Sequence, residues 1–337
     1  MTVSVVIQTS FLGDMVLTTP LLAELATRGP VDVVATPASA PLLANHPAVR
    51  EVLVFDKRRT MRGVRGTWRM AKRLRDREAD VAYLAQGSMR SAGLAALAGI
   101  GERVGFDSSA GRRLCTRTVA YRDRAHHAER LWALGMPDGA LPPSEEAIRP
   151  RLYPGVAERS LVDQLLHASP LAGRPFVALA PGSVWATKRW PFYAELAREV
   201  ARKAPIVIVG GAADGDAARA IAAAVECPVL DATGRLPLLA SAELIGRAAA
   251  LVTNDSSPLH LASAMGTPTV AIFGPTVPAF GFGPLAPRRA IIEHPALPCR
   301  PCDRHGPRVC PLGHWRCMRE LGPAAVAAQL DALLASH

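Results

Sequence analysis

The regular alternation of short apolar segments with longer amphipathic ones most constrains the fold of this chain. The short segments have the length and composition of buried strands, whereas the longer ones repeat apolar residues at helical spacing. This pattern predicts parallel sheets covered by helices. We expect strands at 4–8, 31–35, 52–55, 81–84, 103–106, 176–180, 206–209, 229–231, 250–253 and 269–273. We expect helices at 88–98, 192–203, 217–225, 238–247, 258–265 and 323–334, and a loop followed by a helix within 63–76.

The two remaining regions are less regular in sequence. A helix is expected from about Asp14, and Pro20 should kink or break it because proline cannot donate the backbone hydrogen bond. The proline- and cysteine-rich stretch at 274–317 is expected to be irregular.

The chain length of 337 residues favours two domains. A proline-rich stretch at 137–154 interrupts the alternation and is the best candidate for a linker. We therefore expect an α/β protein with two Rossmann-like domains, at 1–150 and 151–322, followed by a C-terminal helix at 323–337.

Composition excludes several classes of protein. With 49% hydrophobic residues the chain can form buried cores, so wholesale disorder is excluded. No apolar run approaches the ~18 residues of a membrane-spanning helix, and the N-terminus is typical of a strand rather than of a signal peptide. We expect a soluble, cytoplasmic protein. The sequence lacks GxGxxG and GxxxxGK[ST], so dinucleotide and P-loop binding have no motif support.

The net charge of +10 is concentrated in one segment. Nine Lys and Arg residues lie between Lys57 and Arg75, and no Asp or Glu follows until Asp76. A solvated helix face usually alternates its charges, so we interpret this basic run as an anion-binding surface. Solubility and base composition are the alternative explanation. A nucleic-acid partner has no supporting motif.

Gly13 and Asp14 lie where the first predicted strand turns into a helix. Ligand sites in open parallel sheets lie at the carboxyl ends of strands, where Gly13 permits close approach and Asp14 can accept a proton from a hydroxyl. On the local pattern alone, a helix-capping Asp is the better interpretation.

Two stretches after later strands are suited to a phosphate. The first, at 181–191, offers the hydroxyls of Ser183 and Thr187 and the adjacent cations Lys188 and Arg189. Alternatively, Trp190 and Pro191 only start the next helix while Lys188 points to water.

The second stretch, at 254–260, places Ser256 or Ser257 at a helix N-terminus whose free N–H groups can bind phosphate. Asp255 would meet sugar hydroxyls or orient a cation. His260 is equally well explained as a ligand or as a packed core residue.

These stretches together resemble glycosyltransferase family 9, the ADP-heptose:lipopolysaccharide heptosyltransferases. The matching residues are Gln8–Asp14 with Thr18-Thr19-Pro20, Thr187–Pro191, and Thr253–His260 with Gly266-Thr267-Pro268. The tail containing Cys299, Cys302 and Cys310-Pro311-Leu312-Gly313 is similar to the heptosyltransferase II branch. The likeness spans essentially the whole chain, with one departure at Ser257, where a Gly is common.

The resemblance implies a GT-B fold, with two Rossmann-like domains whose parallel sheets face an interdomain cleft. It implies an inverting transfer of heptose from ADP-heptose to the lipopolysaccharide inner core, without a catalytic metal. Asp14 would be the general base, and Lys188 would stabilise the leaving diphosphate. The implied donor-binding residues are Gly13, Ser183, Thr187, Lys188, Gly210, Asp255, Ser256, Ser257 and His260.

The expected acceptor is a phosphorylated lipid A–core, reached by a peripheral protein at the cytoplasmic face of the inner membrane. Arg58, Arg62 and Arg65 of the basic run are the candidate acceptor-binding residues. Nucleic acid is not expected as a partner. The alternatives are another nucleotide sugar or acceptor, a nucleotide-binding oxidoreductase, and a basic nucleic-acid-binding protein.

Four of the six cysteines, Cys299, Cys302, Cys310 and Cys317, form a C-x2-C-x7-C-x6-C cluster. Four thiolates can close a tetrahedral Zn²⁺ or Fe site, and such a cluster in a cytoplasmic protein more often binds metal than forms disulfides. We therefore predict a structural Zn or Fe site. Free thiols packed in a loop are the alternative.

Overall fold

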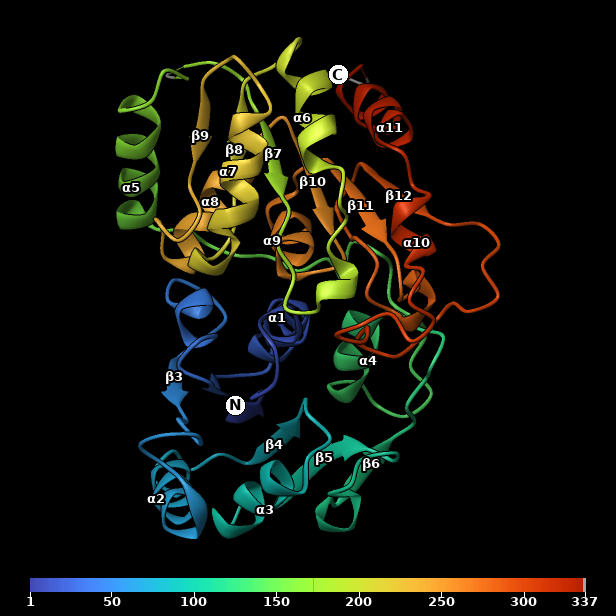
Figure 1. Cartoon of the computed structure of the whole chain (residues 1–337). Helices are drawn as coiled ribbons and strands as arrows, with labels where there is room; N and C mark the ends of the chain where they lie inside the picture. The colour runs from blue at the N-terminus through green and yellow to red at the C-terminus, as the bar shows by residue number, and fades with distance from the viewer. Residues whose placement is uncertain (172, 336–337) are drawn as a thin grey trace. The chain divides into compact units, whose positions relative to one another are not determined.

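The computed structural model describes residues 1–171 and 173–335 and divides into two units, Met1–Tyr153 and Pro154–His337 (Figure 1). Each unit is built on a parallel sheet of six strands, so the expected α/β class is confirmed. The expected boundary at residue 150 lies three residues before this division, and the C-terminal helix belongs to the second unit.

The first unit has the strand order β3-β2-β1-β4-β5-β6. Its strands are β1 (Ser4–Ile7), β2 (Val31–Ala35), β3 (Glu51–Val54), β4 (Val81–Leu84), β5 (Glu102–Phe106) and β6 (Arg117–Val119). Its helices are α1 (Leu12–Ala26), α2 (Gly63–Arg75), α3 (Met89–Leu97) and α4 (His127–Leu134), with short 3₁₀ turns η1 (Ala40–Leu43) and η2 (Arg112–Leu114).

The second unit has the order β12-β11-β10-β7-β8-β9. Its strands are β7 (Val177–Ala180), β8 (Ile206–Ile208), β9 (Val229–Asp231), β10 (Ala250–Asn254), β11 (Thr269–Phe273) and β12 (Arg289–Glu293). Its helices are α5 (Val156–His167), α6 (Tyr193–Ala201), α7 (Gly215–Ala223), α8 (Leu238–Gly246), α9 (Ser257–Met265), α10 (Arg316–Arg319) and α11 (Pro323–Ala335). Short 3₁₀ turns are η3 (Ala186–Lys188), η4 (Ala212–Asp214) and η5 (Pro278–Phe280).

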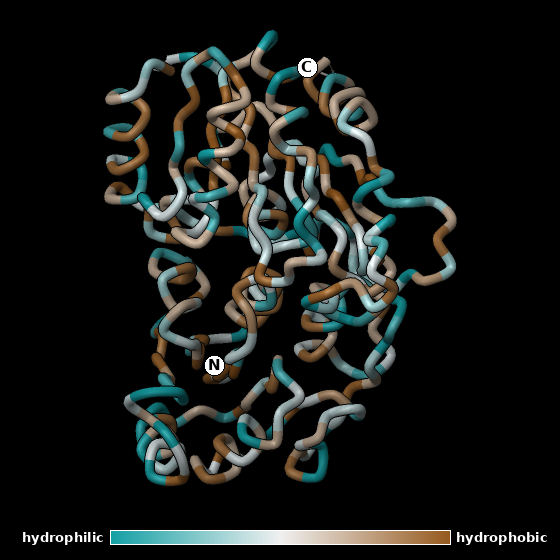
Figure 2. Tube along the Cα trace, in the orientation of Figure 1, coloured by the Kyte–Doolittle hydropathy of each residue, from teal (hydrophilic) through white to brown (hydrophobic). Residues whose placement is uncertain are grey.

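Helices cover both faces of each sheet. In the first unit α1 packs with α4 and α2 packs with α3, and in the second unit α6 contacts α7 and α11 while α8 contacts α5 and α9. The inner strands β1, β2, β4, β7, β8, β10 and β11 are buried along their whole length, as expected for parallel sheets with both faces covered. Figure 2 shows that hydrophobic residues run along these strands.

Helix α1 continues through Pro20, so the expectation of a break there was wrong. Proline cannot donate to the carbonyl of Val16, one turn earlier. The hydroxyl of Thr19 donates to that carbonyl instead, at 2.8 Å. This bond replaces the one that Pro20 cannot make.

The sequence analysis missed β6, α4, α5, β12 and α10. Strand β12 lies within the stretch that was expected to be irregular, where it pairs with β11 in parallel register from Thr269–Arg289 to Phe273–Glu293. It is an edge strand with exposed ends, so its local pattern lacks the continuous apolar run of the central strands.

Both sheets have a point where the strand order reverses, between β1 and β4 in the first unit and between β7 and β10 in the second. Loops that follow the two strands at such a point diverge, and the crevice between them is the usual ligand site of an open α/β sheet. The residues after β1, β4, β7 and β10 are therefore the first place to look for function.

None of the helices described in residues 1–171 and 173–335 is long and apolar enough to cross a membrane.

Candidate active site

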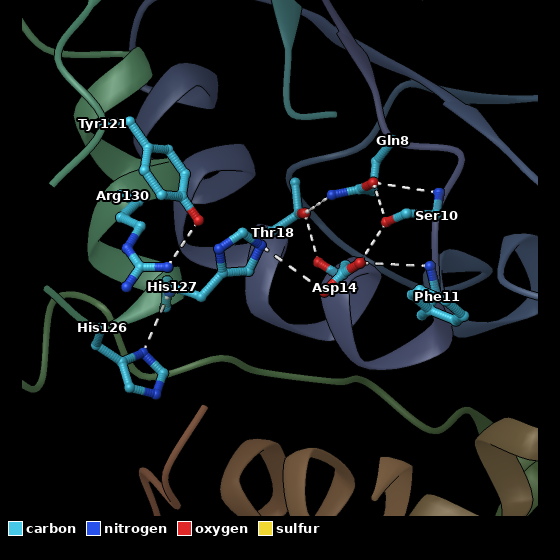
Figure 3. A network of polar contacts seen from close by, with 10 residues as sticks. Gln8, Ser10, Phe11, Asp14, Thr18, Tyr121, His126, His127 and Arg130 are labelled. Carbon is cyan, nitrogen blue, oxygen red and sulfur yellow. Dashed lines mark hydrogen bonds and ion pairs between the residues drawn. The ribbon is translucent and has the colours of Figure 1, made fainter. Parts of the chain in front are cut away.

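Asp14 belongs to a polar network at the carboxyl end of β1 (Figure 3). Its Oδ2 accepts hydrogen bonds from the hydroxyl of Ser10 and from the backbone N–H of Phe11, at 3.4 Å for the latter. The bond from Phe11 caps the N-terminus of α1. The helix-capping interpretation of Asp14 therefore accounts for one of its two carboxylate oxygens.

The other oxygen, Oδ1, faces His127 at the start of α4, whose Nε2 lies 3.7 Å away. Burial, with a smaller contribution from the charge of Arg130, lowers the pKa of His127 to about 3. The imidazole is therefore neutral at physiological pH. A carboxylate capped on one oxygen and facing a neutral imidazole on the other is held in one orientation.

Gln8 and Thr18 complete this network. Gln8 accepts from the Ser10 hydroxyl at 2.7 Å and donates to Thr18 Oγ1 at 3.2 Å, while Thr18 donates to the backbone carbonyl of Asp14 at 2.6 Å. A hydroxyl carries one proton, so Ser10 serves either Gln8 or Asp14 at a given moment. Ser10 can therefore give its hydrogen bond to Asp14 when that carboxylate is ionised.

The loop after β4 joins the same region through Thr9. Thr9 Oγ1 donates to Gln86 Oε1 at 2.6 Å, which links the loops on the two sides of the strand reversal. Lys57 Nζ donates to the carbonyl of Thr9 at 2.7 Å. Burial lowers the pKa of Lys57, as do the charges of Arg90 and Arg58. One member of the basic run is thus part of this network.

In the second unit, Lys188 ends the loop after β7 and Asp255 follows β10. Lys188 Nζ donates to Asp255 Oδ2 at 2.6 Å, and both side chains are about nine-tenths buried. The same oxygen accepts from Thr276 Oγ1 at 2.7 Å. The cation is therefore fixed at the strand reversal rather than pointing to water, which excludes the solvent-facing alternative for Lys188.

Asn254 ties the two loops together. Its Oδ1 accepts from the backbone N–H of Trp190 at 3.1 Å, and its Nδ2 donates to the carbonyl of Pro181 at 2.8 Å. Because Pro181 and Trp190 bracket the loop that carries Lys188, Asn254 sets the position of that loop against β10.

A segment far along the sequence also holds the Lys188 loop. The hydroxyl of Thr187 donates to the carbonyl of Pro307, and Trp315 Nε1 donates to the carbonyl of Thr187 at 2.8 Å. Gly306 lies against the aliphatic part of Lys188, where a Cβ would meet Lys188 Cε at 3.2 Å. The Thr187 hydroxyl is thus engaged within the protein, although it was expected to contact the donor.

Helix α9 begins beside this pair. Ser256 is its N-cap, Ser257 its first residue and Pro258, which has no N–H, its second. The N–H of Leu259 donates to the carbonyl of Ser256 at 3.1 Å, so the N–H of Ser257 is the candidate anion donor of this first turn. The Ser256 hydroxyl oxygen is buried without a hydrogen-bond partner in the described part of the chain. His260 is buried in the first turn and packs against the ring of Phe282, at 6.4 Å between ring centroids.

Two other predicted donor residues flank the loop ends. Ser183 is partly buried and its Oγ accepts from the backbone N–H of Trp185 at 3.3 Å. Gly210 and Gly182 pack closely on the carboxylate of Asp214, where a Cβ would approach to 2.7 and 2.4 Å. Asp214 caps the N–H of Gly211 at 2.9 Å, which engages one of its oxygens within the protein.

The chain matches glycosyltransferase family 9 (heptosyltransferase) over residues 67–314. It is 31% identical to lipopolysaccharide heptosyltransferase 1 of Pseudomonas aeruginosa, in an alignment that covers 97% of each chain. The chain is a member of glycosyltransferase family 9. It is also 29% identical to lipopolysaccharide heptosyltransferase 2 of Escherichia coli K12, over 86% of this chain and 87% of that one.

The structure of E. coli ADP-heptose lps heptosyltransferase II superposes on this glycosyltransferase with a TM-score of 0.80 at 27% identity, covering 99% of both chains. The expected GT-B class of two Rossmann-like sheets is therefore confirmed. Gly13, which the family likeness assigns to the donor, is buried in the first turn of α1, one residue before Asp14.

The predicted acceptor-binding cations of this glycosyltransferase lie on and beside the loop between β3 and α2. Arg58 is in a turn whose N–H groups are capped by Asp56, Arg62 is the N-cap of α2, and Arg65 lies in its first turn. All three are exposed. Because β1, β2 and β3 are parallel, this loop leaves the same edge of the sheet as the loop that carries Asp14.

The four clustered cysteines are all free thiols. Burial, with a smaller contribution from the neighbouring Cys302, raises the pKa of Cys317 to about 11. Burial also raises the pKa of Cys310, but hydrogen bonds from backbone N–H groups, including that of Trp315, outweigh this effect and lower it.

The donor set therefore has the chemistry of a thiolate metal site, and one sulfur lies in a cradle of N–H groups that favours the thiolate. The four side chains are not arranged as the ligands of a bound metal ion. Within residues 1–171 and 173–335, no three or more Cys, His, Asp or Glu side chains are grouped so that they could hold a metal ion.

Sequence reasoning missed His127, Gln86 and Thr276. His127 touches Asp14 across 113 positions, and Thr276 reaches Asp255 across 21. Such pairs have no local spacing that a single sequence could reveal. Asp214 and Asp216 also have the spacing of two carboxylates that bind a metal, but Asp214 caps Gly211 and Asp216 pairs with Arg219.

Proposed function

We propose that this family 9 glycosyltransferase transfers heptose from ADP-heptose to the phosphorylated inner core of lipopolysaccharide. The observation that carries the proposal is the buried Lys188 cation at the strand reversal between β7 and β10, beside the N-terminus of α9. That combination suits a diphosphate, because a fixed cation and the positive end of a helix dipole both stabilise negative charge. Relatives named for heptose transfer support the identity of the sugar.

The proposed reaction is a single inverting displacement. Asp14 accepts the proton of the acceptor hydroxyl, and the hydroxyl oxygen forms a bond to the anomeric carbon. The bond between that carbon and the diphosphate oxygen breaks on the opposite side, and its electron pair leaves with ADP. Lys188, the Ser256 hydroxyl and the N–H of Ser257 at the start of α9 stabilise the charge that grows on the diphosphate.

The charge of Lys188 is shared with Asp255 before donor binds. Since Asp255 also accepts from Thr276, that carboxylate keeps a partner when the lysine turns toward the diphosphate. The buried cation and the buried carboxylate therefore each keep a polar partner. A buried charge without a partner would destabilise the fold. In this proposal these groups do the work of a metal ion, so no catalytic metal is needed.

The proposed acceptor is anchored to lipid, and the enzyme reaches it as a peripheral protein at the cytoplasmic face of the inner membrane. Arg58, Arg62 and Arg65 are proposed to bind its phosphates because they are exposed at the edge of the sheet that carries Asp14. Nucleic acid is not part of the proposal.

We also propose that the four-cysteine cluster binds one structural Zn²⁺ or Fe. The metal would take Cys299, Cys302, Cys310 and Cys317 as ligands and would supply no step of the reaction. The segment that would be fixed includes Gly306 and Pro307, which contact Lys188 and Thr187.

The decisive experiment measures ADP release from ADP-heptose with deacylated inner-core acceptors that lack or carry a first heptose. We expect acceptor-dependent release with one of them. Thermal-shift measurements with ADP, UDP, GDP and NAD form a second arm, because a ligand of the native state raises the melting temperature. Stabilisation by NAD alone would favour the oxidoreductase alternative, and stabilisation by UDP or GDP alone would replace the proposed donor.

A further inference from the structure

Helix α2 exposes two large apolar side chains to solvent. Its inward positions Met70, Ala71 and Leu74 are buried in a core shared with the sheet, and Gly66 is buried against Met61. On the outward side Val64 is 84% exposed and Trp68, one turn later, is 61% exposed. An exposed Trp directly above an exposed Val makes a short apolar ridge that nothing in the described chain covers.

A cationic ridge runs beside the apolar one. Arg65, Arg69 and Lys72 follow each other at spacings of four and three residues, so they share one side of the helix. All three are exposed, and none forms an ion pair with a described residue. Other exposed helical cations of this chain do pair, such as Arg219 with Asp216.

We propose that the outward face of α2 is a docking surface for an anionic lipid bilayer. Tryptophan is favoured at the membrane interface, because its ring is apolar and its N–H can stay near water. Lysine and arginine beside it extend their charges to lipid phosphates while their aliphatic stems lie on the apolar surface. The helix lies in the plane of the interface, with Val64 and Trp68 toward the acyl chains.

The positive charge of the segment predicts a partner that carries negative charge. Between Asp56 and Asp76 the chain carries nine cations and no acidic residue, so a neutral or cationic surface gains nothing from it. Two apolar side chains bury little area, and binding therefore needs both the apolar and the charged ridge. The result is a reversible attachment that salt weakens.

The position of α2 relates this docking surface to the candidate active site of the first unit. The helix begins at the edge of the sheet that also carries Asp14, because it follows directly on the loop from β3. A bilayer bound along α2 would present a lipid-anchored acceptor at that edge. This use of the surface depends on the proposed function, whereas the docking itself does not.

The first test is flotation of the full-length protein with vesicles of phosphatidylcholine alone or mixed with phosphatidylglycerol. We expect binding to the anionic vesicles only. Val64→Ser/Trp68→Ser should weaken it at least about 10-fold. Arg69→Ser/Lys72→Ser should weaken it about 30-fold at low salt and flatten its dependence on salt.

Matched controls remove equally exposed groups elsewhere. Leu141→Ser/Val156→Ser deletes two apolar side chains that are 84% and 78% exposed, and Arg202→Ser/Arg308→Ser deletes two exposed cations. Both should bind within about 2-fold of wild type. Binding by the α2 variants equal to that of the wild type would overturn the proposal, as would equal losses in the controls.

Fluorescence locates the contact. Trp68 is exposed whereas Trp132, Trp185, Trp190 and Trp315 are buried or half-buried. Vesicles that contain brominated lipid should therefore quench wild-type emission, and Trp68→Phe should bind but lose this quenching. Quenching that persists in Trp68→Phe would place the contact elsewhere.

Transfer to a deacylated, water-soluble acceptor separates the two proposals. Val64→Ser/Trp68→Ser should keep wild-type turnover there while losing vesicle binding. Vesicle binding without any transfer by the wild type would sustain the docking surface and reject the proposed function.

Discussion

Lys188 Nζ lies 2.6 Å from Asp255 Oδ2, and each of these side chains keeps only 10% of its exposure. A second Lys–Asp pair, Lys203 with Asp331, has the same 2.6 Å separation but is about half exposed. The two pairs share their chemistry and differ in burial. They therefore provide a direct comparison between a buried pair and a surface pair.

Lys188→Ala should weaken ADP binding about 10- to 100-fold and slow turnover, because the lysine meets a charged partner in the ground state and more charge in the transition state. It should also destabilise the fold by about 3–5 kcal/mol, since Asp255 stays buried without its cation. Calorimetric titration with ADP and denaturant unfolding measure the two effects.

The matched control, Lys203→Ala, should change stability by about 1 kcal/mol or less and leave ADP binding unchanged. Lys188→Met with Asp255→Asn should recover part of the stability without recovering ADP affinity. Unchanged affinity and unchanged rate in Lys188→Ala would remove the lysine from the donor site.

Asp14→Asn should reduce turnover by roughly 10²–10⁴ because it keeps the size of the side chain and removes the base. ADP affinity should stay near wild type, since the contacts of Lys188 are untouched. Steady-state assays with the deacylated acceptor measure the loss. Asp138→Asn, which alters a carboxylate that is 86% exposed in the same unit, is the control and should be silent. Turnover within a few-fold of wild type would exclude Asp14 as the base.

Replacing Arg58, Arg62 and Arg65 together with Ser should raise the KM for a phosphorylated acceptor and make it less sensitive to salt. The donor KM should not change. Arg174, Arg202 and Arg308 are exposed cations of the other unit, and their triple replacement is the control for net charge. If the acceptor KM and its salt dependence match the wild type, the phosphates are bound elsewhere.

The fold should lose stability as the pH falls from 7 toward 5. Burial lowers the pKa of His46 to about 4 and that of His127 to about 3, against 6.5 for an ordinary histidine. Below pH 6.5 the unfolded chain takes up protons that the folded chain does not. Each histidine therefore costs up to roughly 1.4 kcal/mol per pH unit, a slope that is reached below about pH 6.

Urea unfolding at pH 7, 6 and 5 measures this slope. His46→Gln should make it shallower by the contribution of one proton. An identical slope in the variant would mean that His46 titrates in the folded protein as it does in the unfolded chain.

Protein purified without metal-affinity chromatography should contain about one equivalent of Zn or Fe. Cys299→Ser/Cys302→Ser should lose the metal and lower the melting temperature, and Cys115→Ser/Cys227→Ser should keep it. Four freely titrating thiols without metal would contradict the proposed site.

Much of the fold follows from local pattern. The inner strands at 31–35, 81–84 and 269–273 have their expected bounds, because inner parallel strands are mostly apolar runs. The edge strand at 229–231 also has its expected bounds. Edge strand β12 was missed for the opposite reason, since its ends Arg289 and Glu293 are exposed and charged.

Candidate site residues could be predicted from the sequence only where their position next to a predicted strand or helix points to them. Asp14, Lys188 and Asp255 follow strands, so position in the chain already points to them. His127 is brought to Asp14 by the packing of α4 on α1, and the support of Thr187 comes from a backbone carbonyl. A carbonyl has no sequence signature, so only the structure shows that contact.

The two networks belong to separate units, with the contacts of Asp14 drawn from the first and those of Lys188 from the second. Substitutions that share no contact have additive effects on unfolding. A double-mutant cycle of Asp14→Asn and Lys188→Ala should therefore show no coupling energy in the free energy of unfolding. In the proposed reaction both residues act on one transition state, so the same cycle should show a coupling energy in turnover that is absent from stability.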